Sequence, residues 1–353
     1  MIRAMYSGIS GLKVNQNTLD VVGNNIANSG TTAYKSQSIL FQDALSQNIS
    51  EATGPSANVG GTNPSQIGLG VQVGAIDGDI TQGSLQTTNR NLDFAVDGEG
   101  YFAVGLGKNN QKITLFATDD TSNTPNTVDA SNSTMDISFT RDGSFKRDYN
   151  GNLLTSNGYR VMGYALTDAD GAVSIVHSEE AGGLATYNFV DGDDDTNLKV
   201  AEPSGGSGSE LIPLGIPDSV KDADGNSVMI KSFSVDANGV IKATLANNKI
   251  AALGQIAMTS FKNPEGLDKA GKNLLEKSAN SGDAVFRTPV GTASENSNDG
   301  IYGSVRQNRL EASNVDLAEQ FTDMIVASRS FQANGKIITT SDEILESLVN
   351  LKR

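Results

Sequence analysis

Apolar residues recur at every seventh position toward the C-terminal end of the chain. The first row is Leu317, Met324, Phe331, Ile338 and Leu345. A second row, offset by four residues, is Phe321, Ser328, Gly335, Asp342 and Val349. This heptad spacing, uninterrupted by proline, predicts one helix over residues 313–351, about 55 Å long at ~1.5 Å per residue. Ser313 and Asp316 predict a capping box at its start, since a Ser hydroxyl accepts from an N–H one turn on.

The first residues of the chain carry a matching pattern. One row is Met5, Leu12, Leu19 and Ile26, and the other is Ile2, Ile9, Gln16 and Gly23. The pattern predicts a helix from Arg3 to Ala27 that ends at residues 28–30, where Asn and Gly can adopt the left-handed backbone. Two apolar rows at opposite ends of a chain pair most simply with each other, within the molecule or with neighbouring copies.

Small and polar residues interrupt both predicted helices at Gln16, Gly23, Ser328, Gly335 and Asp342. A lone pair of such helices is marginally stable, so we expect these ends to order fully only when further copies surround them. The alternative is an internal helical hairpin that only stabilises a monomer. We predict that the apolar members of the rows form an assembly interface: Met5, Ile9, Leu12, Leu19, Ile26, Leu317, Phe321, Met324, Phe331, Ile338, Leu345 and Val349.

Between the predicted helices the periodicity changes to that of strands. Residues 93–96 lead through Asp97-Gly98 to residues 101–104, which predicts a hairpin. Further turn signals that end in Gly occur at residues 141–143, 149–151, 168–171, 222–225 and 236–239. Asn and Asp before Gly tolerate the positive φ of a tight turn, so each signal predicts a turn between short strands. The chain is therefore predicted to be mainly β with long terminal α-helices that pair as a coiled coil.

The order of these elements predicts nested, discontinuous domains, because the chain runs outward and then returns to the first β region. The predicted parts are a terminal helical domain (1–33 plus 313–353), a connector (34–66), a discontinuous β domain (67–165 plus 246–312) and an inserted outer β domain (166–245). A chain of 353 residues is long enough for two or three such domains.

Composition narrows the possible partners. The 26 basic and 41 acidic residues give a net charge of −15, which argues against nucleic acid or an anionic membrane as a partner. The 38 Gly and the lack of Trp indicate many turns and modest cores. The lack of Cys excludes disulfides, thiol catalysis and Cys-based zinc sites. Arg3 and Lys13 interrupt any secretory signal, and the chain lacks an apolar run of ~18 residues that would span a bilayer.

Few residues offer candidate chemistry. The first, third, fifth and twelfth positions of a possible EF-hand loop are Asp191, Asp193, Asp195 and Glu202. Thr196 occupies the place of the turn Gly, so we interpret this segment as a solvated acidic loop. His177 is the only histidine, which leaves a catalytic triad or a His-based metal site without a partner.

Two further possibilities are weak. Gly68, Gly70 and Gly74 lack the strand-to-helix context of a dinucleotide-binding loop and are interpreted as strand and turn glycines. A glycosidase with two carboxylates would lack a Trp platform for the sugar. We therefore predict a protein that is not an enzyme and has no cofactor or metal.

Four long segments are the most specific motifs of the chain. They are SGISGLKVNQNTLDVVGNNIANSGTTAYK near the start, LDFAVDGEGYFAV and FTRDGSFKRDYNGNLLTSNGYRVMGY in the first β region, and EASNVDLAEQFTDMIVASRSFQANGKIITTSDEILESLVNLKR at the end. These segments resemble the bacterial flagellar rod and hook family. Ala33 departs from that family, which usually has Gly there. The chain length, the inserted outer domain and the ending are more similar to hook subunits than to the shorter distal rod subunits.

The resemblance implies a structural subunit that leaves the cell through the type III export apparatus without a cleaved signal peptide. Many copies would assemble beneath a hook-capping scaffold protein into a curved hollow tube, an extracellular universal joint that transmits torque. Its neighbours would be the flagellar distal rod protein of the basal body and the hook–filament junction protein. The alternatives are a distal rod subunit, or an extracellular binding or enzymatic module anchored by its helical ends.

Overall fold

In the computed structural model the chain forms two compact units, residues 1–81 with 313–353 and residues 82–312. The residues that the structure describes are 2–55, 60–108, 111–115, 128, 135–168, 171–177, 185–193, 198–200, 210–222, 225–287 and 303–351. The first of these units is called the helical unit below, and the second is called the sheet unit.

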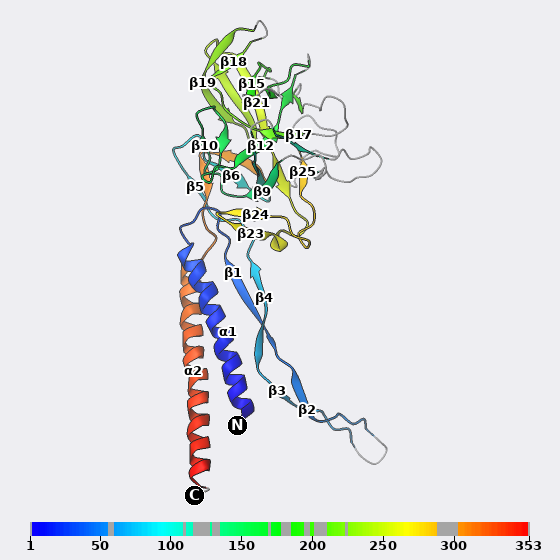
Figure 1. The fold of residues 1–353 in the computed structure, drawn as a ribbon, viewed down its shortest axis with the longest axis vertical. Helices are drawn as coiled ribbons and strands as arrows, with labels where there is room; N and C mark the ends of the chain where they lie inside the picture. The colour runs from blue at the N-terminus through cyan, green and yellow to red at the C-terminus, as the bar shows by residue number, and fades with distance from the viewer. Residues whose placement is uncertain are drawn as a thin grey trace. The chain divides into compact units, whose positions relative to one another are not determined.

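The helical unit consists of two long helices and a β-ribbon. Its elements are α1 (Ile2–Ala27), β1 (Gln37–Asp43), β2 (Ser46–Ser50), β3 (Ser65–Gly68), β4 (Val71–Gly78) and α2 (Leu317–Asn350). β1 pairs with β4 and β2 pairs with β3, both antiparallel. Figure 1 shows α1 and α2 side by side and antiparallel, with the N- and C-termini toward the same end of the pair.

The ends of both helices differ in detail from the sequence prediction. α2 is capped by Asp316, whose side chain accepts from Ala318 N at 2.8 Å and Glu319 N at 3.4 Å. The predicted capping box with Ser313 is therefore wrong, because Asp316 can reach these N–H groups and Ser313 is too far from them along the chain. α1 ends at Ala27 as predicted, but within residues 28–33 the positive φ belongs to Ala33, at 56°.

The described part of the sheet unit contains short strands and a 3-10 turn, η1 (Pro264–Gly266). The strands up to residue 200 are β5 (Leu85–Thr87), β6 (Phe94–Asp97), β7 (Tyr101–Leu106), β8 (Ile113–Thr114), β9 (Asp136–Thr140), β10 (Lys146–Arg147), β11 (Leu153–Leu154), β12 (Arg160–Tyr164), β13 (Leu166–Thr167), β14 (Ile175–His177), β15 (Ala185–Tyr187) and β16 (Lys199–Val200). The remaining strands are β17 (Glu210–Pro213), β18 (Ser219–Lys221), β19 (Ser227–Val235), β20 (Val240–Leu245), β21 (Ile250–Ile256), β22 (Met258–Ser260), β23 (Asp268–Gly271), β24 (Leu274–Glu276), β25 (Val285–Arg287), β26 (Ser304–Gln307) and β27 (Arg309–Glu311).

One large antiparallel sheet dominates this unit. Its main path is β18-β19-β20-β21-β12-β7-β9-β24-β23, and further short strands pair at its sides. Two separate ladders, β5–β27 and β6–β26, bring the beginning and the end of the unit together. The sequence prediction of a mainly β chain with long, paired terminal helices is thus confirmed.

Alternating side chains of the central strands fill two hydrophobic clusters. On β7, Phe102 belongs to the first cluster, whereas its neighbours Tyr101 and Ala103 belong to the second. Val161 and Met162 of β12 divide in the same way. Because successive side chains of a strand point to opposite faces, the centre of the sheet is buried on both sides.

Three of the predicted turns join paired neighbouring strands and share one geometry. In the turns at residues 148–152, 222–226 and 236–240, the Gly N–H donates to the Asp carbonyl three residues earlier. Gly151, Gly225 and Gly239 have φ of 87°, 80° and 79°, a left-handed backbone that favours Gly. These turns therefore form because the Gly accepts this conformation at little cost.

The predicted hairpin at residues 93–104 is wrong, and the predicted turn at residues 141–143 joins two strands that do not pair with each other. β6 pairs with β26, and β7 pairs with β9, β12 and β22, so residues 94–104 do not form a hairpin. Gly98 and Gly100 between them have φ of 117° and 133°, a more extended backbone than that of the tight turns. The turn at residues 141–143 also has another role, since the Gly143 carbonyl accepts from Phe94 N at 3.0 Å.

The segment predicted as a connector, residues 34–66, contains β1, β2 and the first half of β3. Its described part, residues 34–55 and 60–66, is extended and not helical. The first hydrophobic cluster contains residues of both predicted β domains: Phe102 and Val161 belong to the discontinuous domain, and Val220 and Ile241 to the inserted one. The finer division into four domains, including the boundaries at residues 166 and 245, stays a prediction.

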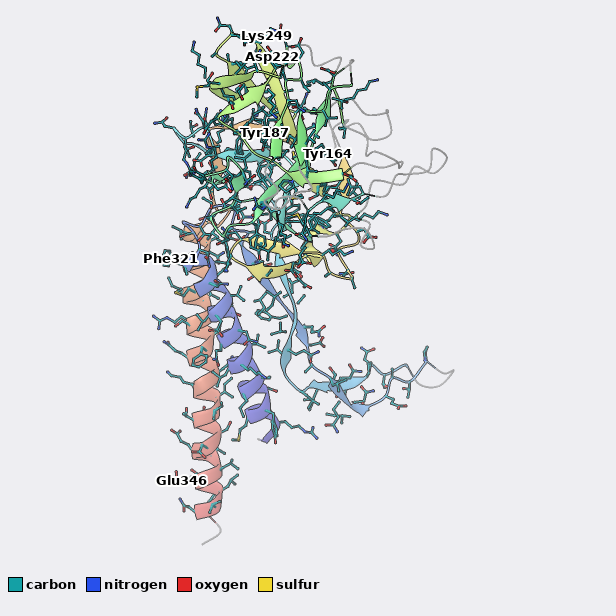
Figure 2. The ribbon with its side chains drawn as sticks, turned by 45° about the horizontal axis from the view of Figure 1, so that its top comes forward. Tyr164, Tyr187, Asp222, Lys249, Phe321 and Glu346 are labelled. Carbon is teal, nitrogen blue, oxygen red and sulfur yellow. The ribbon has the colours of Figure 1, made fainter. Side chains whose placement is uncertain are left out.

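One side chain of the sheet unit lacks a hydrogen bond that its burial would require. The hydroxyl of Tyr187, labelled in Figure 2, is buried and has no hydrogen-bond partner among the residues that the structure describes. Burial, and to a lesser extent the nearby Asp148 carboxylate, raises the pKa of Tyr187 well above its ordinary value of 10.0. The folded protein therefore keeps this proton at a pH at which the unfolded chain loses it.

We predict that Tyr187→Phe removes a pH-dependent loss of stability. Above pH 10 the unfolded state binds fewer protons than the folded state, so the free energy of unfolding falls by about 1.4 kcal/mol per pH unit for such a group. Urea unfolding between pH 8 and pH 11.5 checks this: the variant should decline less steeply by roughly that amount and be no less stable at pH 7. Tyr149→Phe, at an exposed position, is the control, and an unchanged slope in Tyr187→Phe contradicts the prediction.

Candidate functional site

The contact between α1 and α2 is the candidate functional site, because it unites the two ends of the chain. Asn25 Nδ2, in the last turns of α1, donates to Gln320 Oε1 at the start of α2 at 2.8 Å. Near the other end, a Cβ added at Gly8 would lie 3.4 Å from Ile338 Cγ1. These two contacts define the antiparallel register of the pair.

The buried face of α2 follows a heptad pattern. Residues at alternating spacings of four and three line it: Gln320, Met324, Ala327, Phe331, Asn334, Ile338, Ser341 and Leu345. Gln320, Ala327 and Ser341 are buried, whereas Phe331 is still 41% exposed. Small and polar side chains therefore occupy much of the contact.

The predicted first row of α2 agrees with this face, and the second row does not. Met324, Ile338 and Leu345 lie half-buried on it, and Leu317 lies beyond it and is exposed. The second row of the buried face begins at Gln320, one residue before the predicted row that begins at Phe321. The physical reason is that the apolar Phe321 and Val349 suggested the face, whereas polar and small residues make the contact.

On α1 the buried residues are Gly8, Gly11, Val14, Val22 and Asn25. The predicted residues Met5, Leu12, Leu19 and Ile26 flank this face and are half-buried, and Ile9 is exposed. As an assembly interface, the predicted residues of both helices remain a prediction, since these positions are not fully covered within one chain.

Two glycines of α1 bring the helices close together. A Cβ at Gly11 would lie 2.6 Å from Asn334 Nδ2, which is shorter than a van der Waals contact. Gly8 faces Asn334 and Ile338. Glycine is unfavourable inside a helix, by ~1 kcal/mol relative to Ala, so its benefit here is the close approach of α2.

Asn25 joins three elements through one side chain. Its Nδ2 donates to Gln320 Oε1 and to the Gln37 carbonyl, both at 2.8 Å. Its Oδ1 accepts from Gln37 N at 3.0 Å and from the Tyr34 hydroxyl at 3.1 Å. The amide thus pairs with the first residue of β1 as a neighbouring strand would, and links it to both helices.

A second amide holds the segments before α2 and after β4. Asn314 Oδ1 accepts from Ser36 N at 2.7 Å, and Asn314 Nδ2 donates to the Asp79 carbonyl at 2.9 Å. Lys35 Nζ donates to the Thr81 carbonyl at 2.6 Å. Asn25 and Asn314 were both missed by the sequence reasoning, although both lie within the recognised motifs, because their roles depend on residues distant in the chain.

A further contact between α1 and the β-ribbon lies at Gly70. Val71 N donates to Ser10 Oγ at 3.3 Å, and Gly70 has φ of 126°. A Cβ at Gly70 would lie 2.2 Å from Ser10 Oγ, so only Gly fits at this crossing.

Many large hydrophobic side chains of the helical unit are exposed. Exposed large hydrophobic side chains lie on both helices and along the ribbon: Tyr6, Ile9, Leu40, Phe41, Leu45, Ile49, Ile67, Leu69, Ile76, Ile80, Leu317, Phe321, Ile325, Val326, Phe331, Ile337, Ile344, Leu348, Val349 and Leu351. Phe321 and Ile325, one turn apart on α2, are 51% and 63% exposed. Figure 2 labels Phe321 near the start of α2 and Glu346 near its end. Surfaces of this kind indicate binding to other protein chains.

The residues considered for metal binding lie partly within the described part of the chain. Among the described residues, His, Cys, Asp and Glu do not gather in groups of three that could hold a metal ion. Asp191 Oδ1 accepts from Asp193 N at 3.1 Å, whereas Asp195 and Glu202 lie outside the described residues. His177 lies in β14.

The glycines considered for a dinucleotide loop belong to the ribbon. Gly68 ends β3, Gly70 follows it, and Gly74 lies inside β4, so they do not join a strand to a helix. Within the described residues, no helix combines the length and apolar character needed to cross a membrane.

Three family models match the chain. "Flagella basal body rod protein" matches residues 5–35, "Flagellar hook protein FlgE/F/G D1 domain" matches residues 128–257, and "Flagellar basal body rod FlgEFG protein C-terminal" matches residues 306–351. The first match includes most of α1, the third includes α2, and the second lies within the sheet unit.

Similar proteins come from several bacteria. The flagellar basal-body rod protein FlgG of Bacillus subtilis is 36% identical over 353 residues, which covers all of both chains. The flagellar hook protein FlgE of Borreliella burgdorferi is 31% identical over 455 residues, again covering all of both chains. The flagellar hook protein FlgE of Escherichia coli is 26% identical over 452 residues, covering 99% of this chain and all of that protein.

We predict that Asn25→Ala destabilises the helical unit by about 3 kcal/mol, because it removes the buried hydrogen bond to Gln320 and two hydrogen bonds to the backbone of Gln37. Hydrogen exchange of β1 and of the first turns of α2 in the full chain checks this and should become faster in the variant. Asn24→Ala is the matched control, since Asn24 is exposed and its side chain bonds only to Asn28 among the described residues. Equal exchange in the two variants contradicts the prediction.

Proposed function

Because the chain belongs to the flagellar rod and hook family FlgE/F/G, we propose that it is the structural subunit of the flagellar hook. As a member of this family it is a non-enzymatic subunit of the axial rod and hook structure of the bacterial flagellum. In the proposed hook, many copies form a curved hollow tube that transmits torque between rod and filament.

The observation that carries self-assembly is the apolar outer surface of the helical unit. Phe321 and Ile325 expose more than half of their side chains to water. On the same helix, the polar Gln320 is buried. Burying such side chains contributes roughly 25 cal/mol for each Å² removed from water. Contacts with neighbouring copies therefore supply the apolar burial that the α1–α2 pair lacks.

The sheet unit suits an adjustable exterior. Its hydrophobic clusters are internal, and its surface carries ion pairs that remain accessible to water, such as Lys112–Glu210 at 2.7 Å and Lys277–Asp283 at 3.4 Å. The net charge of −15 keeps such surfaces hydrated. Polar, hydrated contacts between outer surfaces can change during rotation while the terminal helices keep the tube continuous.

The hook assignment implies a set of neighbours. The subunit would be exported through the type III apparatus without signal cleavage and would assemble outside the cell beneath a capping scaffold protein. The distal rod protein of the basal body would bind one end of the tube, and the hook–filament junction protein the other.

The alternative is a subunit of the distal rod. The FlgG rod protein of Bacillus subtilis favours it, since it is 36% identical over all of both chains. The expectation that rod subunits are shorter than this chain is wrong for this relative, and the alignments with the two hook proteins extend over 455 and 452 residues. Electron microscopy of the polymer formed by the purified full chain separates them. Curved tubes support the hook assignment, and straight rigid tubes support the rod.

We predict that Phe321→Asp abolishes polymerisation while the monomer keeps its fold, because Phe321 is exposed and does not lie on the face toward α1. The predicted interface also includes Phe331 and Leu19, and the same substitution there is expected to prevent polymerisation. Sedimentation and electron microscopy measure polymer, and circular dichroism measures the fold.

Met229→Asp, at an exposed apolar residue of β19, is the matched control and should polymerise. Tubes of normal dimensions from Phe321→Asp would show that this face of α2 is not an assembly contact.

A further inference from the structure

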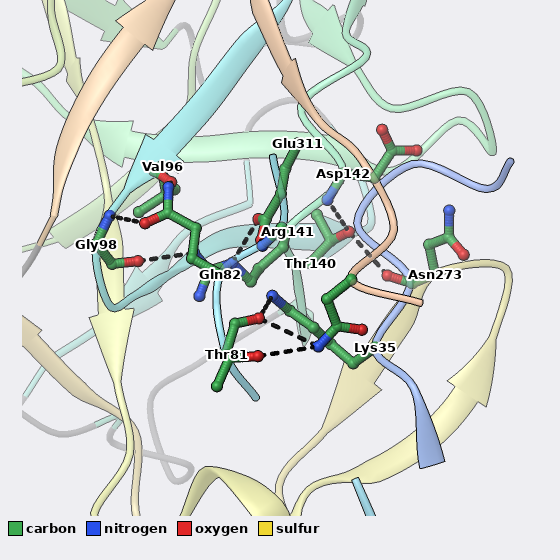
Figure 3. A network of polar contacts seen from close by, with 12 residues as sticks. Lys35, Thr81, Gln82, Val96, Gly98, Thr140, Arg141, Asp142, Asn273 and Glu311 are labelled. Carbon is green, nitrogen blue, oxygen red and sulfur yellow. Dashed lines mark hydrogen bonds and ion pairs between the residues drawn. The ribbon is translucent and has the colours of Figure 1, made fainter. Parts of the chain in front are cut away.

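Two charged side chains are buried at the place where the chain enters and leaves the sheet unit (Figure 3). Arg141 Nε donates to Glu311 Oε2 at 2.9 Å, and the two side chains are 6% and 0% exposed. Arg141 Nη2 also donates to the Gly98 carbonyl at 2.7 Å. Glu311 Oε1 accepts from Gly83 N at 2.9 Å. Such hydrogen bonds compensate for the hydration that a buried ion pair loses.

The partners of this pair belong to three segments of the chain. The incoming segment is residues 82–84, the outgoing segment is residues 309–312, and the third is the loop of Gly98 between β6 and β7. Gln82 Nε2 donates to the Val96 carbonyl, and Gln82 Oε1 accepts from Gly98 N, both at 3.1 Å. One polar network therefore connects the incoming and outgoing segments to the sheet.

The ladder between the two segments is short. β5 and β27 have three residues each, and the Ala312 N–H extends their pairing by donating to the Ser84 carbonyl at 2.8 Å. An isolated two-stranded ladder is at best marginally stable in water. The buried ion pair supplies a directional connection that the ladder alone does not provide.

Glycine is required at the centre of this network. Gly98 has φ of 117°, and a Cβ there would lie 2.8 Å from Gly303 Cα. The backbone of Gly98 both donates to Gln82 and accepts from Arg141. Its conformation therefore places both backbone groups within reach of the incoming segment and the ion pair.

We infer that Arg141 and Glu311 form a clamp that fastens the incoming and outgoing segments to the sheet, so that torque enters the sheet unit through both segments together. The clamp is a property of the folded chain, and only its mechanical use rests on the proposed function. Both are positioning residues, since they act by holding backbone segments in place.

The direct test is hydrogen exchange in Glu311→Gln, read separately for the β5–β27 ladder and for the central β7–β9 and β20–β21 ladders. The substitution keeps the shape of the side chain but removes the charge that Arg141 faces. We expect amide exchange in β5 and β27 to rise by roughly 100-fold, with the central ladders unchanged.

The matched control is Asp97→Asn. Arg306 Nε and Asp97 Oδ2 form an ion pair at 3.2 Å on the neighbouring β6–β26 ladder, but the side chains are 50% and 41% exposed. This exposed pair should matter little, so exchange in every ladder should stay at the level of the unsubstituted chain.

Two outcomes overturn the clamp. Exchange that rises equally in all ladders means that the pair only adds general stability, and unchanged exchange in β5 and β27 means that it holds nothing. If Glu311→Gln does not fold, Arg141→Lys provides the same comparison, because Lys keeps the charge but lacks the planar fork that reaches both Glu311 and Gly98.

Cells with the same variants test the mechanical use. Glu311→Gln should form tubes of normal shape, yet lose more swimming speed than Asp97→Asn as the viscosity of the medium rises. Equal speeds at high viscosity contradict the role in torque. Failure of the unsubstituted chain to polymerise would refute the proposed function and leave the exchange result intact.

Discussion

The helical unit depends on a contact that is close but only partly apolar. Gly8 and Gly11 let α2 approach α1, and the amide of Asn25 holds Gln320 and the first residue of β1. A single buried amide of this kind can set the register of two helices at some cost in stability. Because polar and small groups occupy the inner face, large apolar side chains such as Phe321 and Ile325 remain outside. The small and polar contact between α1 and α2 thus sets their register and leaves large apolar side chains exposed for contacts with further copies.

The sheet unit differs from the helical unit because its apolar side chains fill buried clusters. The centre of its sheet is buried on both faces, so Phe102 and Tyr101 of one strand enter different hydrophobic clusters. It is therefore complete without neighbouring copies, apart from its two connections to the helical unit. At these connections Arg141 and Glu311 place charge in the interior, where breaking an ion pair costs about 3–5 kcal/mol. The helical unit thus exposes large apolar side chains, whereas the sheet unit buries its apolar side chains and holds its first and last segments with a buried ion pair.

Heptad spacing and Asp/Asn-Gly turns were enough to predict the terminal helices, their pairing and a mainly β centre. The row of α2 that contacts α1 begins at Gln320, one residue before the predicted row that begins at Phe321, because polar and small residues make this contact. The role of Phe321 in assembly stays a prediction. The hairpin at residues 94–104 was wrong because β6 and β7 pair with strands from other parts of the chain. Periodicity reports local conformation, whereas the bonds of Asn25, Asn314 and Glu311 join residues far apart in sequence. Ala33 has φ of 56°, a left-handed backbone conformation that favours Gly, and the sequence pattern alone did not indicate it.

The central claim is that polymerisation covers the apolar outer face of α2. Hydroxyl-radical footprinting of Phe321 and Ile325, compared between the soluble chain and its polymer, measures this directly. The account predicts that both side chains are labelled readily in the soluble chain and become protected in the polymer. Equal labelling of both residues in the two states would contradict it.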